Sequence, residues 1–315
     1  MSFSSDVKEE LSKQLSTARH CQIAEIAAII SMCGGISISK EDKYCLRIQT
    51  ENLSVARKYF TLLKKTFNID TEVSIKQNSY PKRTHVYLVL VKKHEDTMKI
   101  LQATKLIGPD GEVWENLSVH DNLVIQRSCC KRAFIRGAFL ASGSISNPQK
   151  SYHFEIACAT EKKAEQLRGI INSFEMDAKI VQRKKYHVVY IKEGSQIVDI
   201  LNVMEAHVAL MNLENVRILK EMRNSVNRKV NCETANINKT VNAAVKQIED
   251  IRYIQKKIGF ESLGEGLADT ARLRLEHPDA SLKELGMMLT PQVGKSGVNH
   301  RLRKLSTLAE ELRGN

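Results

Sequence analysis

The chain has 315 residues, of which 42% are hydrophobic, and this combination predicts two folded domains and excludes a wholly disordered protein. Forty-eight Lys and Arg against 36 Asp and Glu give a net charge of +12, which favours a polyanionic partner such as a nucleic acid. No stretch approaches about 18 consecutive apolar residues, and the N-terminus lacks the apolar core of a signal peptide. We therefore predict a cytoplasmic chain with no membrane partner.

The seven cysteines follow no recognised ligand spacing. Their number is odd, Cys129 and Cys130 are adjacent, and no Cys-x-x-Cys pair occurs. Neither a disulfide framework nor a zinc cluster is therefore predicted from the spacing. The sequence also lacks a glycine-rich phosphate loop of the Walker or Rossmann type, so we predict no cofactor and no metal.

Helix and strand signals occur twice in the same order between about residues 20 and 205. In the first copy an apolar helix over 23–33 precedes a hairpin, an amphipathic helix, two strands and a last helix. The second copy opens with a helix over 132–141 and repeats this order. Each copy reads αββαββα. Residues 1–205 are therefore predicted to form a pseudo-symmetric tandem domain, with repeats at about 20–105 and 125–205.

Beyond residue 205 the strand signals vanish. A helix is predicted over 214–223, and an Asn-rich run follows within a helical linker of residues 206–237. One interpretation is a polar hinge or a second DNA-contacting segment that uses Arg228, Lys229 and Lys239. The other is a loop whose Asn side chains bond backbone groups and cap a helix beginning at Asn238. The sequence leaves both open.

Residues 238–315 are predicted to form an all-helical domain in which about 280–313 carry a helix-turn-helix pattern. Ser281 and Glu284 have the spacing of a capping box for its first helix. Gly286 provides a small side chain where two helices cross near a right angle. The second helix is predicted over 295–305, with Val298, Leu302 and Leu305 facing inward.

The outward face of this second helix is the predicted DNA-binding site. Because Asn pairs with adenine and cations meet phosphates, we predict that seven residues contact double-stranded DNA: Lys295, Ser296, Asn299, His300, Arg301, Arg303 and Lys304. The alternative is a basic amphipathic helix in an ordinary bundle. No acid occurs between Glu284 and Glu310, and this favours DNA binding.

The ends of the two opening helices carry a recognisable motif. The segments IAAIISMCGG (Ile26–Gly35) and IRGAFLASGS (Ile135–Ser144) resemble the paired signature of LAGLIDADG homing endonucleases. The resemblance implies two helices packed at a pseudo-two-fold axis, and it places the former catalytic positions at Cys33 and Ser142. Magnesium prefers hard oxygen ligands, normally carboxylates, so a thiol and a hydroxyl at these positions predict that the chain is not an enzyme.

The degenerate tandem together with the C-terminal motif resembles the WhiA family of bacterial regulators over essentially the whole chain. The resemblance implies an α+β tandem followed by a helix-turn-helix domain like sigma-factor region 4. It also implies nucleoid-associated DNA binding without cleavage, and a part in transcription regulation, sporulation, or cell division and chromosome segregation. Transcription or division proteins are expected partners.

Two further hypotheses compete with a sequence-selective regulator. One is a nucleoid or division adaptor that uses DNA only as an anchor, and the other is a metal-dependent endonuclease with rearranged ligands. Strand and turn cations of the tandem domain fit three interpretations, namely contact with DNA, contact with protein, and charges that keep the strand edges soluble. These cations are Lys76, Lys82, Arg83, Lys92, Lys93, Arg183, Lys184 and Lys185.

Overall fold

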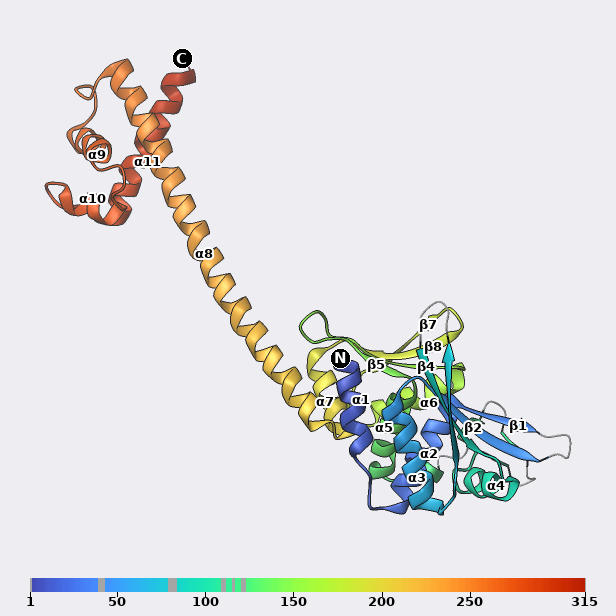
Figure 1. Ribbon diagram of the computed structural model, residues 1–315. Helices are drawn as coiled ribbons and strands as arrows, with labels where there is room; N and C mark the ends of the chain where they lie inside the picture. Colours follow the sequence, from blue (N-terminus) through green and yellow to red (C-terminus); the bar gives the residue numbers. More distant parts are fainter. Residues whose placement is uncertain are drawn as a thin grey trace. The chain divides into compact units, whose positions relative to one another are not determined.

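A computed structural model of the chain describes residues 2–38, 43–78, 84–108, 112–114, 117–119 and 123–314 (Figure 1). Contacts between residues group the chain into two compact units, Met1–Lys220 and Glu221–Asn315. The first unit is α+β and the second is all-helical, so the predicted fold class is confirmed.

The first unit contains the predicted order αββαββα twice, after an opening helix α1 (Phe3–Lys13) that was not expected from the sequence. The first copy comprises α2 (Arg19–Cys33), β1 (Gly34–Ile38), β2 (Tyr44–Thr50), α3 (Leu53–Phe67), β3 (Glu72–Asn78), β4 (Thr84–Val91) and α4 (His94–Ala103). The second comprises α5 (Ser128–Ser142), β5 (Gly143–Ile145), β6 (Phe154–Cys158), α6 (Glu161–Asn172), β7 (Lys179–Arg183), β8 (Tyr186–Ile191) and α7 (Gly194–Met204). A short 3-10 helix, η2 (Leu123–Ile125), precedes α5.

Each copy folds its four strands into one antiparallel sheet of the same topology. The strand orders are β1-β2-β4-β3 and β5-β6-β8-β7. In β2, Leu46 and Ile48 are buried, while Arg47 and Gln49, which alternate with them, are exposed. This alternation follows from the two-residue period of a strand and turns one face of the sheet to the core.

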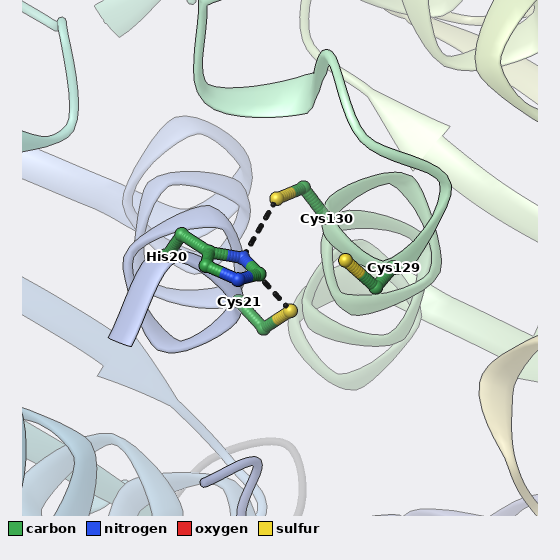
Figure 2. Close-up of side chains that lie close together, drawn as sticks. All are labelled: His20, Cys21, Cys129 and Cys130. Carbon is green, nitrogen blue, oxygen red and sulfur yellow. Dashed lines mark hydrogen bonds between the residues drawn. The ribbon is translucent and has the colours of Figure 1, made fainter. Parts of the chain in front are cut away.

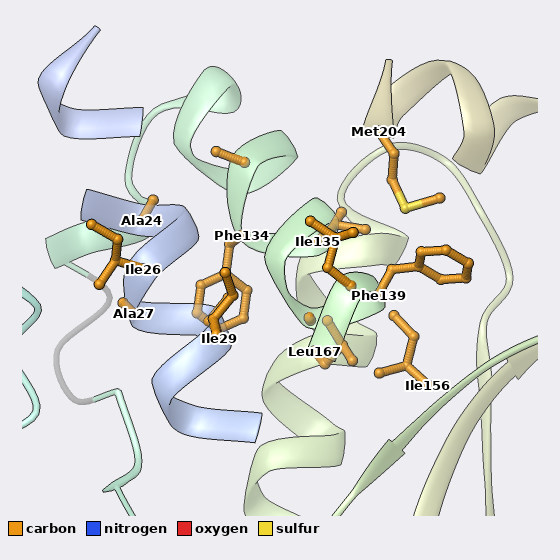
Figure 3. Packing of buried hydrophobic residues seen from close by; sticks show 14 of the residues in the cluster. Ala24, Ile26, Ala27, Ile29, Phe134, Ile135, Phe139, Ile156, Leu167 and Met204 are labelled. Carbon is orange, nitrogen blue, oxygen red and sulfur yellow. The ribbon is translucent and has the colours of Figure 1, made fainter. Parts of the chain in front are cut away.

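The centre of the first unit is the pair of helices α2 and α5, which pack closely along their length. Residues Ile26 to Ile30 of α2 are all fully buried, so the helix is apolar on every side. Buried side chains of α2 and α5 form one hydrophobic cluster with residues of the surrounding elements, such as Ile156, Leu167 and Met204 (Figure 3). On α5, Gly137 lies where a Cβ would stand 2.6 Å from the Glu25 carbonyl oxygen, and this permits the close approach.

Buried charges lie beside this apolar interface. The Glu25 carboxylate on α2 receives Lys58 Nζ from α3 at 2.5 Å and Arg136 Nε from α5 at 3.1 Å. Arg136 also reaches the Glu205 carboxylate, with Nη1 at 2.6 Å from Oε2. Glu25 and Lys58 side chains are fully buried, so each charge depends on its partners to offset desolvation.

The second unit is built from four helices. The long helix α8 (His207–Ile258) begins in the first unit and ends in the second, where α9 (Glu265–Glu276), α10 (Leu282–Met288) and α11 (Lys295–Gly314) follow. Its core is formed by nine buried residues, namely Ile251, Ile254, Ala271, Leu285, Leu289, Val298, Leu302, Leu305 and Ala309.

One local prediction is wrong. The Asn-rich run was interpreted as a polar hinge or a second DNA-contacting segment, or as a loop that caps a new helix at Asn238. Residues 207–258 form a single continuous helix, so the loop and the helix start at Asn238 are wrong, whereas DNA contact by this segment stays a prediction. This span contains no Pro and no Gly. Asn is only a moderate helix former but not a breaker, so the backbone continues through the run.

Candidate nucleic-acid interface

The turn between α10 and α11 has the predicted helix-turn-helix geometry. Ser281 caps α10: its Oγ accepts from the Glu284 backbone N–H at 3.3 Å, and the Glu284 Oε2 accepts from the Ser281 N–H at 2.7 Å. The hydrogen bonds from Ser281 hold the pKa of Glu284 below its usual range, because they favour the charged form. The predicted capping box is therefore confirmed.

Gly286 fixes the approach of the two helices. The Val293 N–H donates to the Gly286 carbonyl at 2.9 Å, and a Cβ on Gly286 would stand 2.1 Å from the Val293 carbonyl oxygen. Val298, Leu302 and Leu305 are 0–1% exposed, as predicted, so this face of α11 is committed to the core. The helix continues beyond the predicted residue 305 to Gly314 because Ala309 extends the buried stripe.

Five of the seven predicted DNA-contacting side chains are exposed on α11: Lys295, Ser296, His300, Arg303 and Lys304. Lys295 and Ser296 lie in the first turn of the helix, and Arg303 and Lys304 lie two turns further on. A helix N-terminus carries a partial positive charge, and the cations add to it. The exposed face of α11 is therefore suited to an anionic ligand.

Arg301 departs from its predicted outward position. It is half-buried, and its Nη1 donates to the Gly266 carbonyl at 3.1 Å and lies 3.5 Å from Thr270 Oγ1. A Cβ on Gly266 would stand 3.1 Å from the guanidinium carbon, so the absence of a side chain there makes room for Arg301. Its side chain thus joins α11 to α9.

Asn299 lies in a groove of about 730 Å³ together with Lys295 and with Lys239 of α8. Apolar side chains including Val241, Val245 and Leu282 line the same groove. The structure thus brings one of the predicted secondary contacts, Lys239, to the predicted recognition helix. Arg228 and Lys229 are exposed elsewhere on α8, and the Arg228 Nε donates to the Asn224 carbonyl at 3.3 Å.

Arg274 is a polar residue of this groove that was not expected from the sequence. Its Nη1 donates to the Ala280 carbonyl at 2.7 Å, and it is only 3% exposed. Burial lowers the pKa of the guanidinium. The Arg274 side chain thus holds the segment that leads into α10. The sequence signal for this structural role is the place of Arg274 on the buried face of the amphipathic helix α9.

Cys33 and Ser142, the positions predicted to be former catalytic ones, lie at the C-terminal ends of α2 and α5, where the side chain of each bonds a carbonyl of its own helix. Cys33 Sγ donates to the Ile29 carbonyl at 3.3 Å, and Ser142 Oγ donates to the Ala138 carbonyl at 3.4 Å. Burial raises the pKa of Cys33 to about 12, although the Lys8 ammonium opposes this shift. The thiol is therefore neutral at physiological pH.

Lys8 of α1 and Cys33 line the same pocket. This pocket has a volume of about 870 Å³, and its lining also includes Gln49, Glu51 and Tyr87. The Lys8 ammonium lies 5.8 Å from the centre of the Phe139 ring. The sequence shows no sign of this arrangement because α1 precedes the first repeat. A cation thus lies beside Cys33, one of the two predicted former catalytic positions.

The strand cations of the tandem domain are in part engaged locally. Lys92 Nζ lies 2.7 Å from the Glu72 carboxylate, and Arg183 Nη1 lies 2.8 Å from that of Glu155. Lys82 and Arg83 fall outside the described residues. Contact of the sheets with DNA or protein stays a prediction.

A repeated αββαββα unit around two central helices, followed by an all-helical unit with two helices joined by a tight turn, defines a LAGLIDADG-like tandem joined to a helix-turn-helix domain. Comparisons with known proteins agree with this class. The WhiA N-terminal LAGLIDADG-like domain matches residues 19–107, the WhiA LAGLIDADG-like domain matches 131–223, and the WhiA C-terminal HTH domain matches 226–309. In the part of the chain that the structure covers, no helix has the length and apolarity needed to cross a bilayer.

Full-length relatives identify the family. The chain is 58% identical to the probable cell division protein WhiA of Lachnoclostridium phytofermentans, over 99% of this chain and 100% of the relative. It is 48% identical to that of Alkaliphilus oremlandii, over 99% and 98%. The crystal structure of full-length WhiA from Thermatoga maritima has the same fold, with a TM-score of 0.60 at 24% identity and 99% coverage of both chains. The chain belongs to the WhiA family.

Proposed function

We propose that the chain is a sequence-selective regulator that binds double-stranded DNA through the outward face of α11. The observation that carries this proposal is the set of exposed polar and cationic side chains on a helix whose opposite face is locked into the core by Val298 and Leu302. In helix-turn-helix proteins the N-terminal part of the second helix contacts base edges, and cations contact the phosphates.

Different residues have different tasks in this proposal. Asn299, near the start of α11, reads a base edge, because a carboxamide pairs with adenine in the major groove. Arg303 and Lys304 contact phosphates and set the affinity. Lys239, which shares the groove with Asn299, adds a further phosphate contact. Arg301 acts indirectly by holding α11 against α9.

DNA is bound without being cut. Hydrolysis of a phosphodiester by paired metals requires carboxylate oxygens near the scissile phosphate. The motif resemblance assigns those acids to the positions of Cys33 and Ser142, which offer a thiol and a hydroxyl instead, and the Lys8 ammonium beside Cys33 repels a divalent cation. Retention of the central helix pair without its acids supports an architectural role for it.

The relatives are named as probable cell division proteins. We infer that this chain works at the nucleoid and regulates genes of cell division, chromosome segregation or sporulation, with transcription or division proteins as partners. Selection of genomic fragments by the purified chain identifies its target sites.

Fluorescence anisotropy tests the proposal. It gives the affinity of the chain for a selected site and for a scrambled duplex at a series of salt concentrations. The double variant Arg303→Ala, Lys304→Ala should weaken binding to both duplexes and flatten the salt slope by about 2, close to one unit per lost phosphate contact. Asn299→Ala should instead reduce the preference for the selected site by about tenfold. The matched control is Lys256→Ala, Lys257→Ala, which removes two exposed cations from the last turn of α8 and should leave the slope unchanged.

Three outcomes count against the proposal. If the α11 double variant binds like the wild type, the DNA-binding surface lies elsewhere. Equal affinity of the wild type for selected and scrambled duplexes would indicate an adaptor that uses DNA only as an anchor. Nicking of supercoiled plasmid in Mg²⁺ or Mn²⁺ would show that cleavage has been retained.

A further inference from the structure

Four potential metal ligands meet where α2 and α5 begin. His20 and Cys21 come from the first turn of α2, and Cys129 and Cys130 come from the first turn of α5 (Figure 2). Their ligand atoms all lie within 4.8 Å of one another. His20 Nδ1 lies 3.2 Å from Cys130 Sγ and 3.3 Å from Cys21 Sγ.

The cluster is a product of the internal repeat. Cys129 follows His20 by 109 residues and Cys130 follows Cys21 by the same number, which is also the separation of Cys33 and Ser142. In each helix the two ligands are the second and third residues, after Arg19 in α2 and Ser128 in α5. Because α2 packs closely on α5, the neighbouring residues His20 and Cys21 of one helix and Cys129 and Cys130 of the other form one cluster of four potential ligands.

The geometry fits one tetrahedral ion. Donors at about 2.0–2.3 Å from a tetrahedral zinc ion lie about 3.3–3.8 Å from one another. The separations of His20 Nδ1 from the two sulfurs, 3.2 and 3.3 Å, fall near this range. Because no two ligand atoms of the set are more than 4.8 Å apart, a contraction of about 1 Å would bring all four to a zinc ion. Three sulfurs and one imidazole nitrogen form a soft donor set that selects zinc over magnesium or calcium.

The surroundings favour the charge of such a site. Three thiolates and one Zn²⁺ carry a net charge of −1, and two helix N-termini direct their partial positive charges toward it. The Arg127 backbone gives Cys130 a hydrogen bond that favours the thiolate. Cys21 and Cys130 are buried, at 5% and 4% exposure, whereas Cys129 is exposed and offers a path of entry.

Without a cation the buried thiols of Cys21 and Cys130 are protonated. Burial raises the pKa of Cys21 to about 12 and also raises that of Cys130. Binding of a metal must release these protons, so its affinity should increase with pH.

We propose that His20, Cys21, Cys129 and Cys130 bind a structural zinc ion that ties the start of α2 to the start of α5. Four protein ligands leave no open coordination position, and this is typical of structural rather than catalytic zinc. The ion would clamp the helix pair at the end opposite Cys33 and Ser142. This inference does not depend on the proposed DNA binding.

Metal content of the purified full-length chain tests the proposal. After zinc loading and dialysis, we expect about one zinc per chain, the number that one four-ligand site holds. Cobalt(II) in its place should produce the intense visible bands of tetrahedral coordination and a thiolate-to-cobalt charge-transfer band. Zinc should also protect the exposed Cys129 thiol from alkylation, a measurement that reports on the site in the wild-type fold.

Matched variants separate the site from the other thiols. Cys129→Ser removes a ligand without placing a polar group in the core, and it should lower zinc affinity by more than about 100-fold, since even outer-shell changes cost up to that much. Cys232→Ser, the exposed counterpart on α8, should bind zinc like the wild type. Cys158→Ser is the buried control for Cys130→Ser.

Three results would overturn the proposal. One is a wild-type chain that retains no zinc and gives no cobalt spectrum. Another is equal zinc affinity in Cys129→Ser and the wild type. The third is freshly purified protein that is lighter by two hydrogens and contains a Cys21–Cys130 disulfide, because the cluster would then be a redox pair.

Discussion

The backbone of Glu25 passes so close to Gly137 that a methyl group on Gly137 would stand 2.6 Å from the Glu25 carbonyl oxygen and 2.9 Å from the Ala28 Cβ. Both near atoms belong to rigid parts of α2, a backbone oxygen and the Cβ of a fully buried Ala. The pairing of α2 with α5 is thus set by the absence of one side chain.

Gly137→Ala should destabilise the first unit. Ala normally stabilises a helix interior relative to Gly, but here the added methyl forces the helices apart, and overpacking of a core costs about 1–3 kcal/mol. Thermal and urea unfolding followed by circular dichroism measures the change. Gly169→Ala on α6 is the control, because nothing lies within 4 Å of its Cβ position. That variant should gain about 0.5–1 kcal/mol, and a gain at both positions would contradict the close approach.

Glu25→Gln should destabilise the fold by about 3 kcal/mol at neutral pH, because it leaves Lys58 and Arg136 without their shared buried carboxylate. Urea unfolding at equilibrium gives the value. The surface variant Glu9→Gln removes a partner of the exposed Lys13 and should change stability far less, because exposed ion pairs contribute little. Equal effects of the two substitutions would mean that the buried network contributes no more than a surface ion pair.

The pH dependence of Glu25→Gln follows from Lys58. Burial lowers the pKa of Lys58, and the Glu25 carboxylate opposes this shift, so its removal lowers the pKa of Lys58 further. The unfolded chain then binds more protons than the folded one, and stability rises with pH between the folded and the unfolded pKa of Lys58. The stability lost in Glu25→Gln should therefore become smaller in alkaline solution. A loss that grows with pH would contradict the assignment of this effect to Lys58.

Arg301→Met should lower the stability of the second unit, because it removes the hydrogen bond to the Gly266 carbonyl that joins α11 to α9. A loss of about 1.5–3 kcal/mol is expected for a hydrogen bond made by a charged group. Arg303→Met, two residues away on the exposed face, should stay within about 0.5 kcal/mol of the wild type. Hydrogen exchange of α9 amides gives the readout, and similar exchange in both variants would place Arg301 among the solvent-facing cations instead.

The start of α10 should loosen in acid. Hydrogen bonds from Ser281 lower the pKa of Glu284, so its contribution to stability is present above the unfolded pKa and is lost as the pH falls through the folded pKa. Backbone amide exchange at the start of α10 should therefore accelerate in this acid range for the wild type. In Glu284→Gln the neutral side chain keeps a hydrogen-bond acceptor but has no proton to gain, so this acceleration should vanish. Its persistence in the variant would assign the effect to another carboxylate.

Much of the local structure could be read from the sequence because it depends on neighbours along the chain. Both αββαββα copies follow from periodicity, and the α10 cap follows from Ser281 and Glu284 at the spacing of a capping box. The sequence also contains the reason that α8 is continuous, since no Pro or Gly interrupts residues 207–258, although the cluster of Asn residues favoured a hinge or a loop.

Tertiary packing alone decided which distant side chains meet. His20 and Cys130 are 110 residues apart, and no motif of fixed spacing joins them; they touch because α2 and α5 pack from their first turns. Lys8 reaches the pocket of Cys33 only because α1 lies against the tandem, and Arg301 turns inward only because Gly266 of α9 leaves room. Periodicity specifies the face of a helix that is buried, whereas the partner of each side chain depends on how the elements pack.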